Sequence, residues 1–497
     1  MPNQQVNSVE EKPSQSAPKM RLANVYRRLV SGETTRKGLM SVVGQSALSL
    51  ANLVTATYIG RVGGKEQLGL YALALTIVYT MRAVQGELVA APYTIYWHRK
   101  KTSELASYRG SAVIHQLILC GLTSFGLAIF LLSLSLGLGP AELMPTVAVL
   151  VVASPFILSR CFARHVMFAH MHFGMAMIID LVTAVTQIAA LLVVGYLGAL
   201  TAPVAFGILG IVCGTATLAW YFTTPHPIHY QIDQAGKDWS ENWKFARWAL
   251  ASSLVGCSTP YIMPWLLNAT HGVAQTGFYA AGATLIGLSH IYVLGIANII
   301  TPRATQTFVN HGPQQLRRFL IQVCPVLVLP MIAFATMLFL TGDLVPTLCF
   351  GTEYSNLGVI CTILGTAAAI NSVSIIAGNG FWAIDRPKDN LWADATVLAT
   401  TFVAAVLLVF PYGPLGAAIA TLIGVTCGTL VRGSMLFVTL QNIARTEPSK
   451  SKSWMEPETK TEIELETEIE LETEIELETE IELETEIELE TEIELET

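Results

Sequence analysis

Two side chains able to carry positive charge lie at matching depths of two apolar stretches. Arg82 lies midway through the stretch near 68–92, and His290 lies midway through the one near 276–300. An unpaired charge is costliest in the middle of a membrane, so one that is retained there usually serves a substrate pathway or an internal partner. Arginine can hold a phosphate through two parallel hydrogen bonds, and a protonated histidine would add charge. The pair therefore predicts a substrate cavity that receives a pyrophosphate or an acidic sugar.

Glu87 is a third candidate for this cavity and also an alternative partner for Arg82. It follows Arg82 by five residues, which is a rotation of about 140° around a helix. The two therefore do not form the simple ion pair that a spacing of four would favour. The alternative is that Arg82 is neutralised by Glu87 or another carboxylate, while His290 only bonds a neighbouring helix. We favour a cavity role for Arg82 because of the cost of keeping its charge in hydrocarbon.

Three further titratable side chains in apolar stretches are candidates for ion or proton coupling: Asp180, Asp394 and His115. The two aspartates match each other, since they follow Ala169 and Ala383 respectively by eleven residues. Each aspartate lies near the inner end of its stretch, so an anchor at a helix end is an equal alternative to a proton or cation site. For His115 the commoner role is that of a satisfied interior histidine.

A nine-residue phrase that occurs twice sets the architecture around these candidates. Residues 64–72 and 272–280 both fit Gly-x-x-Gln-x-Gly-x-Tyr-Ala, at an offset of 208 residues that also relates Arg82 to His290. The two aspartates are related by a similar offset of 214. The chain is therefore predicted to be a duplicated half. We expect the glycines of the phrase to serve close turns and helix entry.

The composition is that of a polytopic membrane protein. Of the 497 residues, 52% are hydrophobic and only 13% are charged, and the mean hydropathy is +0.51. The net charge of −8 comes from residues 461–497, which are copies of Thr-Glu-Ile-Glu-Leu-Glu, whereas the rest of the chain is basic. The eight cysteines include no Cys-x-x-Cys pair and predict neither a disulfide framework nor a metal site.

About twelve stretches are long and apolar enough to be transmembrane helices, six in each half. The first six lie near 38–60, 68–92, 110–137, 142–160, 173–198 and 201–223, and the second six near 246–267, 276–300, 318–341, 357–383, 390–411 and 413–438. Lysine and arginine gather in alternate loops, which places both termini in the cytoplasm by the positive-inside rule. Because six is even, the halves are predicted to be parallel repeats with the substrate site between them.

The predicted fold class is thus an all-α polytopic membrane protein with five regions. They are a cytoplasmic N-terminal segment (1–37), an N-lobe (38–223), a cytoplasmic linker (224–245), a C-lobe (246–440) and a cytoplasmic tail (441–497). We expect the linker to be a solvated loop, and the charge density of the tail predicts a disordered, self-repelling extension.

The loops on the outer side are too short for an extramembrane domain, which disfavours a membrane-embedded glycan enzyme. The sequence also contains no P-loop, no zinc-binding spacing on a helix and no nucleophile elbow. We therefore predict that the chain is not an enzyme, has no catalytic residue, and holds no cofactor and no metal.

Gln45, Asn52, Arg61, the repeated phrase and the stretch Gly413–Ala420 (Gly-Pro-Leu-Gly-Ala-Ala-Ile-Ala) carry a family resemblance. Over roughly residues 36–440 the chain resembles the polysaccharide flippases of the multidrug/oligosaccharidyl-lipid/polysaccharide exporter superfamily. The resemblance implies two six-helix lobes that form a V around a central cavity and work by alternating access. It also implies that lipid-linked oligosaccharide or a polysaccharide precursor crosses the inner membrane. The family has no catalytic signature to carry over.

The expected partners follow from this resemblance: the lipid-linked glycan substrate, membrane lipid, a coupling ion (H⁺ or Na⁺), and other polysaccharide-assembly proteins, with no nucleic acid. One alternative has the same fold, an ion-coupled multidrug or small-molecule antiporter, which would favour acidic cavity residues for organic cations. The glycan enzyme is the alternative from a different class.

Overall fold

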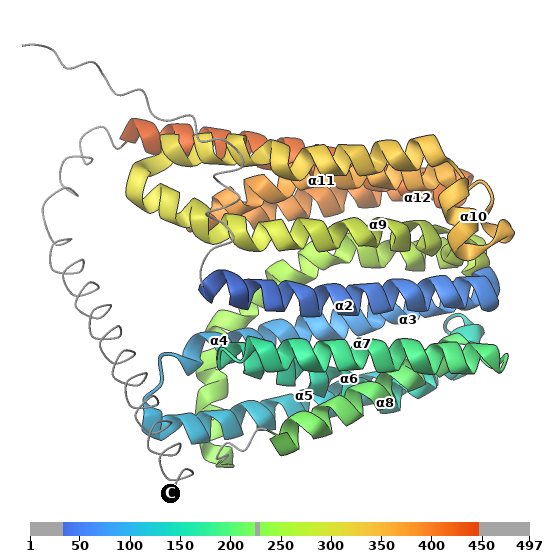
Figure 1. The fold of residues 1–497 in the computed structure, drawn as a ribbon, viewed down its shortest axis with the longest axis horizontal. Helices are drawn as coiled ribbons and strands as arrows, with labels where there is room; N and C mark the ends of the chain where they lie inside the picture. The colour runs from blue at the N-terminus through green and yellow to red at the C-terminus, as the bar shows by residue number, and fades with distance from the viewer. Residues whose placement is uncertain (1–32, 224–228, 447–497) are drawn as a thin grey trace, which may run out of the picture.

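The computed structural model describes residues 33–223 and 229–446, and every element in them is helical (Figure 1). The first half contains α2 (Glu33–Val62), α3 (Gly64–Gln85), the π-helical turn η1 (Gly86–Ala90), α4 (Ala91–Trp97), η2 (Thr102–Glu104), α5 (Leu105–Ser135), η3 (Ala141–Leu143), α6 (Met144–Ala169), α7 (Phe173–Tyr196) and α8 (Ala202–Thr223). The second half contains α9 (Ile232–Thr341), α10 (Leu344–Phe350), η4 (Thr352–Tyr354), α11 (Gly358–Ala383) and α12 (Pro387–Thr446).

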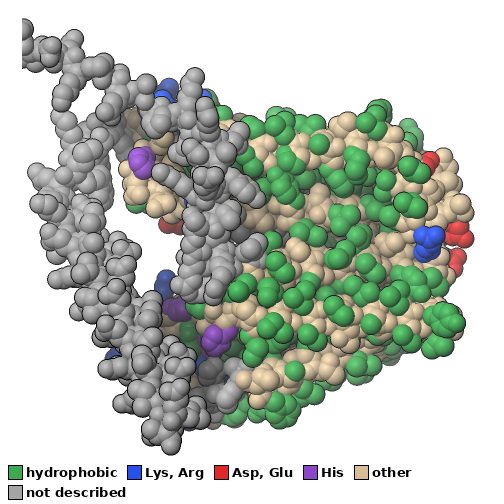
Figure 2. All heavy atoms as spheres, viewed as in Figure 1, with side chains coloured by type: hydrophobic (Ala, Val, Ile, Leu, Met, Phe, Trp, Pro, Cys, Tyr) green, Lys and Arg blue, Asp and Glu red, His purple; other side chains and the backbone are tan. Residues whose placement is uncertain are grey.

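Hydrophobic side chains cover the flank of the helices, while charged side chains gather at the two ends (Figure 2). Within the described residues, nine helical segments are long and apolar enough to cross a membrane. Apolar side chains on such a flank are stable only against lipid or another apolar surface. The predicted all-α, multi-pass membrane architecture is therefore confirmed.

Two of the nine segments belong to helices far longer than a bilayer requires. α9 covers 110 residues and α12 covers 60. Gly272 (φ 80°) and Gly312 (φ 77°) interrupt α9, and Gly413 (φ 53°) interrupts α12. Glycine adopts such positive φ angles without the steric cost that a Cβ atom imposes. The three interruptions fall at or beside loops that the sequence predicts between spans, whereas the count of twelve spans stays a prediction.

The helices form two lobes that share a core at one end only. One lobe contains α5–α8, and the other contains α11, α12 and much of α9 (Figure 1). Near the phrase glycines Gly64 and Gly272, a single buried cluster includes residues of both halves. We call this end the joined end. At the opposite end, the split end, the cluster around Tyr93 and the cluster around Phe381 are separate. Among the described residues, the lobes thus share a buried cluster at the joined end and have separate buried clusters at the split end.

The two copies of the repeated phrase pack directly against each other at the joined end. A Cβ atom at Gly69 would lie 2.1 Å from the carbonyl oxygen of Val273, and one at Gly277 would lie 1.8 Å from that of Lys65. The sixth position of each phrase therefore faces the backbone of the second position of the other. The first glycines, Gly64 (φ 76°) and Gly272 (φ 80°), turn the chain into each helix. The predicted role of the phrase glycines in turns and helix entry is confirmed for Gly64 and Gly272, whereas the backbone approach at Gly69 and Gly277 was not predicted.

The prediction of a solvated loop for 224–245 is wrong from Ile232 onward; residues 224–228 lie outside the described part of the chain. This part of α9 packs on the first half, and Ala235, Asp238 and Asn242 are buried at helical spacing. Tyr108 donates a hydrogen bond of 3.2 Å to Asn242 Oδ1. The buried face of the linker combines Ala235 with the polar Asp238 and Asn242, so its amphipathic character is weak in sequence.

Lys100 fastens the same linker helix to the first half. Its Nζ lies 2.8 Å from Glu241 Oε2 and 3.4 Å from Asp238 Oδ1. Burial opposes the charge of Lys100, but the hydrogen bond and charge of Glu241, together with Asp238, outweigh burial and raise the pKa of Lys100. The ammonium is therefore fully protonated at neutral pH and holds both carboxylates.

Candidate functional site

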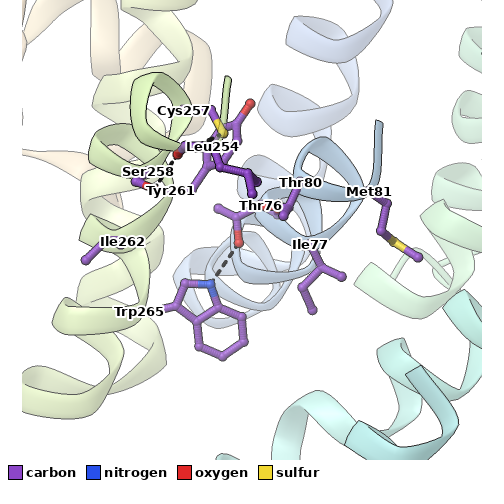
Figure 3. A pocket seen from close by; sticks show the side chains of 10 residues that line it. All are labelled: Thr76, Ile77, Thr80, Met81, Leu254, Cys257, Ser258, Tyr261, Ile262 and Trp265. Atoms are coloured by element: carbon purple, nitrogen blue, oxygen red, sulfur yellow. Dashed lines mark hydrogen bonds between the residues drawn. The ribbon is translucent and has the colours of Figure 1, made fainter. Parts of the chain in front are cut away.

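A cavity of about 340 Å³ lies between the halves, with α3 on one side and α9 on the other (Figure 3). Its lining residues recur at helical spacing of three and four, so each helix turns one face toward the gap. Trp265 Nε1 donates a hydrogen bond of 2.9 Å to Thr76 Oγ1 across the gap. The lining residues are Thr76, Ile77, Thr80, Met81, Leu254, Cys257, Ser258, Tyr261, Ile262 and Trp265.

Arg82 directly follows the cavity-lining residue Met81 and is half-buried. Its guanidinium carbon lies 5.9 Å from the centre of the Tyr79 ring. That ring stacks on Tyr261 of α9, with 5.8 Å between the centroids. Among the described residues no carboxylate lies within 4.0 Å of this guanidinium, so the alternative of an ion pair with Glu87 is not formed. Arg82 thus lies next to the cavity lining with no carboxylate partner among the described residues, and its electrostatic neighbours include Cys161 of α6 and Cys213 of α8 as well as Tyr261.

Glu87 lies on the π-helical turn η1, between Arg82 and the split end. Pro92 follows this turn, and a proline removes a backbone donor and crowds the preceding turn, which explains the local widening of the helix. The Glu87 carboxylate is half-buried and interacts with the Ser253 side chain of α9. Ser253 precedes the cavity-lining Leu254, so Glu87 faces the same gap as the cavity.

His290 lies in α9, but its side chain is outside the described residues. The predicted pairing of His290 with Arg82 across the cavity therefore stays a prediction.

Asp180 is held by two arginines of the preceding helix, α6. Arg164 Nε donates a hydrogen bond of 2.8 Å to Asp180 Oδ2, and Arg160 pairs with Oδ1. Only 1% of the aspartate side chain is exposed. Gly44 of α2 packs on the same carboxylate, because a Cβ atom there would lie 2.7 Å from Oδ2. A doubly paired, enclosed carboxylate of this kind fastens α6, α7 and α2 together.

Asp394, the matching aspartate of the second half, has a different partner. Arg432, which lies later on α12, pairs with Asp394 Oδ1, and 31% of the aspartate side chain is exposed. The other terminal nitrogen of Arg432 donates a hydrogen bond of 2.7 Å to Ser374 Oγ. Ser374 follows Arg160 by the repeat offset of 214, so the serine occupies the position of the first-half arginine.

His115 of α5 faces the linker helix and not the cavity. Its Nε2 donates a hydrogen bond of 2.9 Å to the Ala235 carbonyl oxygen, and its ring meets the edge of Trp239 at 5.2 Å. None of the five described candidates lines the cavity itself. Glu87 contacts Ser253 of α9 across the gap between the halves, and Arg82 follows the cavity-lining Met81, whereas Asp180, Asp394 and His115 bind elsewhere.

The aromatic wall of the cavity was not predicted. Tyr261 and Trp265 lie in the stretch near 246–267, one helical turn apart. Their spacing from Leu254 and Ser258 is the signal that could have indicated a shared face. In a membrane helix, however, the opposite face is also apolar, so periodicity alone does not identify the inner face.

Comparison with known proteins supports the fold. No protein-family model matches the chain. Over 201 residues it is 23% identical to the probable low-salt glycan biosynthesis flippase Agl15 of Haloferax volcanii, a match that spans 39% of this chain and 41% of that protein.

Two solved structures cover far more of the chain. One is the inward-facing conformation of a multidrug resistance MATE family transporter of the MOP superfamily, with a TM-score of 0.69, 14% identity and coverage of 82% of this chain and 99% of that one. The other is the lipid II flippase MurJ in an inward closed conformation, with a TM-score of 0.66, 13% identity and coverage of 82% and 93%. Each of the three proteins is named as a transporter or a flippase. The chain has the helical fold of the MOP-superfamily transporters.

Proposed function

We propose that this protein flips a lipid-linked oligosaccharide, or a polysaccharide precursor, across the inner membrane by alternating access. The observation that carries the proposal is Arg82, a half-buried arginine that follows the cavity-lining Met81 and has no carboxylate partner among the described residues. A lipid pyrophosphate is anionic, and a guanidinium in a low-dielectric gap attracts it strongly. The names of Agl15 and MurJ as flippases support the same substrate class.

The separate cores at the split end supply the mechanical basis of this proposal. Lobes that share no core at that end can part or close there without breaking a packed interior. The joined end closes the cavity through the glycine crossing of the two phrases. Transport then consists of substrate entry from the split end, closure of that end, and opening of the crossing.

We place the split end and both termini in the cytoplasm. Arg99, Lys100 and Lys101 lie in the connection between α4 and α5 at the split end, whereas Arg61 and Lys65 are the basic residues beside the phrase at the joined end. The richer side is cytoplasmic by the positive-inside rule. In this orientation the substrate moves from the inner leaflet to the outer leaflet.

We propose H⁺ or Na⁺ as the coupling ion, with Asp394 as the better of the two aspartate candidates. Asp180 is enclosed and neutralised by two arginines, while Asp394 has one arginine and a partly exposed carboxylate. Exchange of a proton or cation requires access, which only Asp394 has in this conformation.

Arg82 is the direct test of the proposed function. Arg82→Ala and Arg82→Lys should both impair the flipping of a fluorescent polyprenyl pyrophosphate glycan in proteoliposomes, because neither replacement binds a pyrophosphate through two parallel hydrogen bonds. Arg317→Ala is the matched control, since Arg317 also lies over an aromatic ring, that of Phe437 at 4.8 Å, but away from the cavity. If the Arg82→Ala variant flips the lipid at the normal rate, the assignment of Arg82 to the substrate site is refuted.

An ion-coupled antiporter of small organic cations is the second candidate. Glu87 faces the gap beside an aromatic wall, an arrangement that suits a cation, and the MATE transporter shares the fold. Under this alternative, Glu87→Gln should abolish the efflux of a fluorescent organic cation by the reconstituted protein. If the unmutated protein shows no efflux of the organic cation, the antiporter alternative is excluded.

A further inference from the structure

A second cavity lies between the halves at the joined end. Its volume is about 510 Å³, and it is bounded by Phe130, Pro140 and Glu142 of the first half and by Asn268 and Gly272 of the second. Trp265 lines this cavity as well as the one beside Arg82. The indole is therefore a wall shared by the two cavities, and its hydrogen bond to Thr76 holds it in place.

The lining of the second cavity differs in charge from the edge of the first. It contains the carboxylate of Glu142 and the half-buried amide of Asn268, and its described lining includes no lysine or arginine. Among the described residues, the Asn268 side chain forms no hydrogen bond, so its donors and acceptor are available to a ligand. A carboxylate repels phosphate but accepts hydrogen bonds from hydroxyl groups.

Aromatic rings complete the lining. Phe130 meets Trp265 nearly edge-on, with 6.2 Å between the centroids and 69° between the planes. Because Trp265 lines the cavity, part of the indole can serve as a flat apolar platform for a ligand. The C–H face of a sugar ring packs on such a platform while its hydroxyls bond polar groups at the rim. The chemistry of this cavity fits an uncharged, hydroxyl-rich ligand.

We propose that the second cavity is a subsite for the neutral part of the glycan, with Trp265 as its platform. This inference rests on the proposed function. Thr76 and Arg82 are six residues apart on α3, about 9 Å along the helix axis. The pyrophosphate at Arg82 and the glycan at Trp265 are thereby bound by separate groups, and the hydrogen bond to Thr76 keeps the indole in place.

The test compares two fluorescent lipids in proteoliposomes: a bare polyprenyl pyrophosphate and the same lipid carrying a neutral oligosaccharide. Trp265→Leu should slow the glycan-bearing lipid about tenfold more than the bare lipid, because an aromatic contact of this size discriminates by about that factor. Arg82→Ala should slow both lipids alike. Trp392→Leu is the matched control, since 67% of that tryptophan is exposed on the flank of α12.

Two further variants guard against a folding defect. Trp265→Phe keeps an aromatic platform and should retain most of the preference for the glycan-bearing lipid, and Asn268→Ala should reduce it severalfold. An unchanged ratio in Trp265→Leu, with normal flipping by the unmutated protein, would overturn the subsite and leave the proposed function standing.

Failure of the flippase itself gives a different pattern. If the unmutated protein moves neither lipid, the proposed function is wrong, and calorimetry with the free neutral oligosaccharide decides the subsite separately. Binding that Trp265→Leu abolishes and Trp392→Leu preserves would support the subsite, and absence of binding would overturn it.

Discussion

The aspartates of the two halves occupy matching positions but sit in different environments. Asp180 is enclosed and receives two arginines from the helix before it, whereas Asp394 is partly exposed and receives one arginine from later in α12. Ser374 fills the position of the first-half arginine and binds the guanidinium that replaces it. Both halves thus keep the carboxylate, but its cation comes from the preceding helix in the first half and from later in α12 in the second. Equivalence of position therefore does not imply equivalence of role.

The largest expected effect is the loss of the first-half carboxylate. Asp180→Ala leaves two arginines near one another without their counter-charge, and the cost should be about 3 to 5 kcal/mol of unfolding free energy. Asp394→Ala should cost less, because its site is partly open to solvent. Thermal unfolding in detergent measures both. Equal losses of unfolding free energy in the two variants would show that the different environments of the two aspartates do not change their contribution to stability.

Rebuilding the first-half arrangement in the second half should have the next largest effect. Arg432→Leu removes the only described cation beside Asp394 and should cost about 2 kcal/mol. Adding Ser374→Arg restores a guanidinium from the position that Arg160 occupies in the first half, in the space that Arg432 vacates. The double variant should recover about half of the loss in the same unfolding assay, and a further loss would show that the two positions are not interchangeable.

The repeated phrase should behave symmetrically, in contrast to the aspartates. Gly69→Ala and Gly277→Ala each place a methyl group against a backbone carbonyl of the other phrase. Overpacking of this kind costs about 1 to 3 kcal/mol, and it should be similar for both variants. Gly126→Ala serves as the control, because nothing lies within 4 Å of a Cβ atom there. Clearly unequal losses of unfolding free energy would show that the two phrases are symmetric in geometry but not in their contribution to stability.

The smallest expected effect concerns the linker, which Lys100 fastens to the first half. Lys100→Met should cost about 0.5 kcal/mol, since 44% of the Glu241 side chain is exposed and solvent-screened pairs of this kind are weak. The folded pKa of Lys100 is raised above 10.5, so its contribution is complete below that pH and is lost only as pH rises through the folded value. The difference between the unmutated protein and Lys100→Met should therefore be the same at pH 6 and pH 9. A difference that changes across this range would assign the effect to another group.

Hydropathy and repetition were sufficient to predict the helical membrane fold and the turn role of the phrase glycines. Both signals are visible along the chain without knowledge of which helices lie side by side. The partners of Asp180 and Asp394 were not predictable, since they depend on which helices lie side by side. The linker helix was missed because Ala235 and Ala246 give its packed face little hydropathy contrast. Arg82 and Glu87 could be located by their charge, whereas Trp265 could not, because an aromatic residue is unexceptional on any face of a membrane helix.

The crossing of the two phrases has the form of a contact between identical subunits. Residue 69 meets residue 273 while residue 277 meets residue 65, which is the reciprocal pattern of a two-fold homodimer interface. A half-length ancestor bearing this phrase would have presented a patch complementary to itself and paired with its own copy. If the chain arose by duplication, as the repeated phrase predicts, fusion would have made the association of the two copies independent of concentration. It would also have let each copy change separately, so that the arginine beside one aspartate could be exchanged while the other remained.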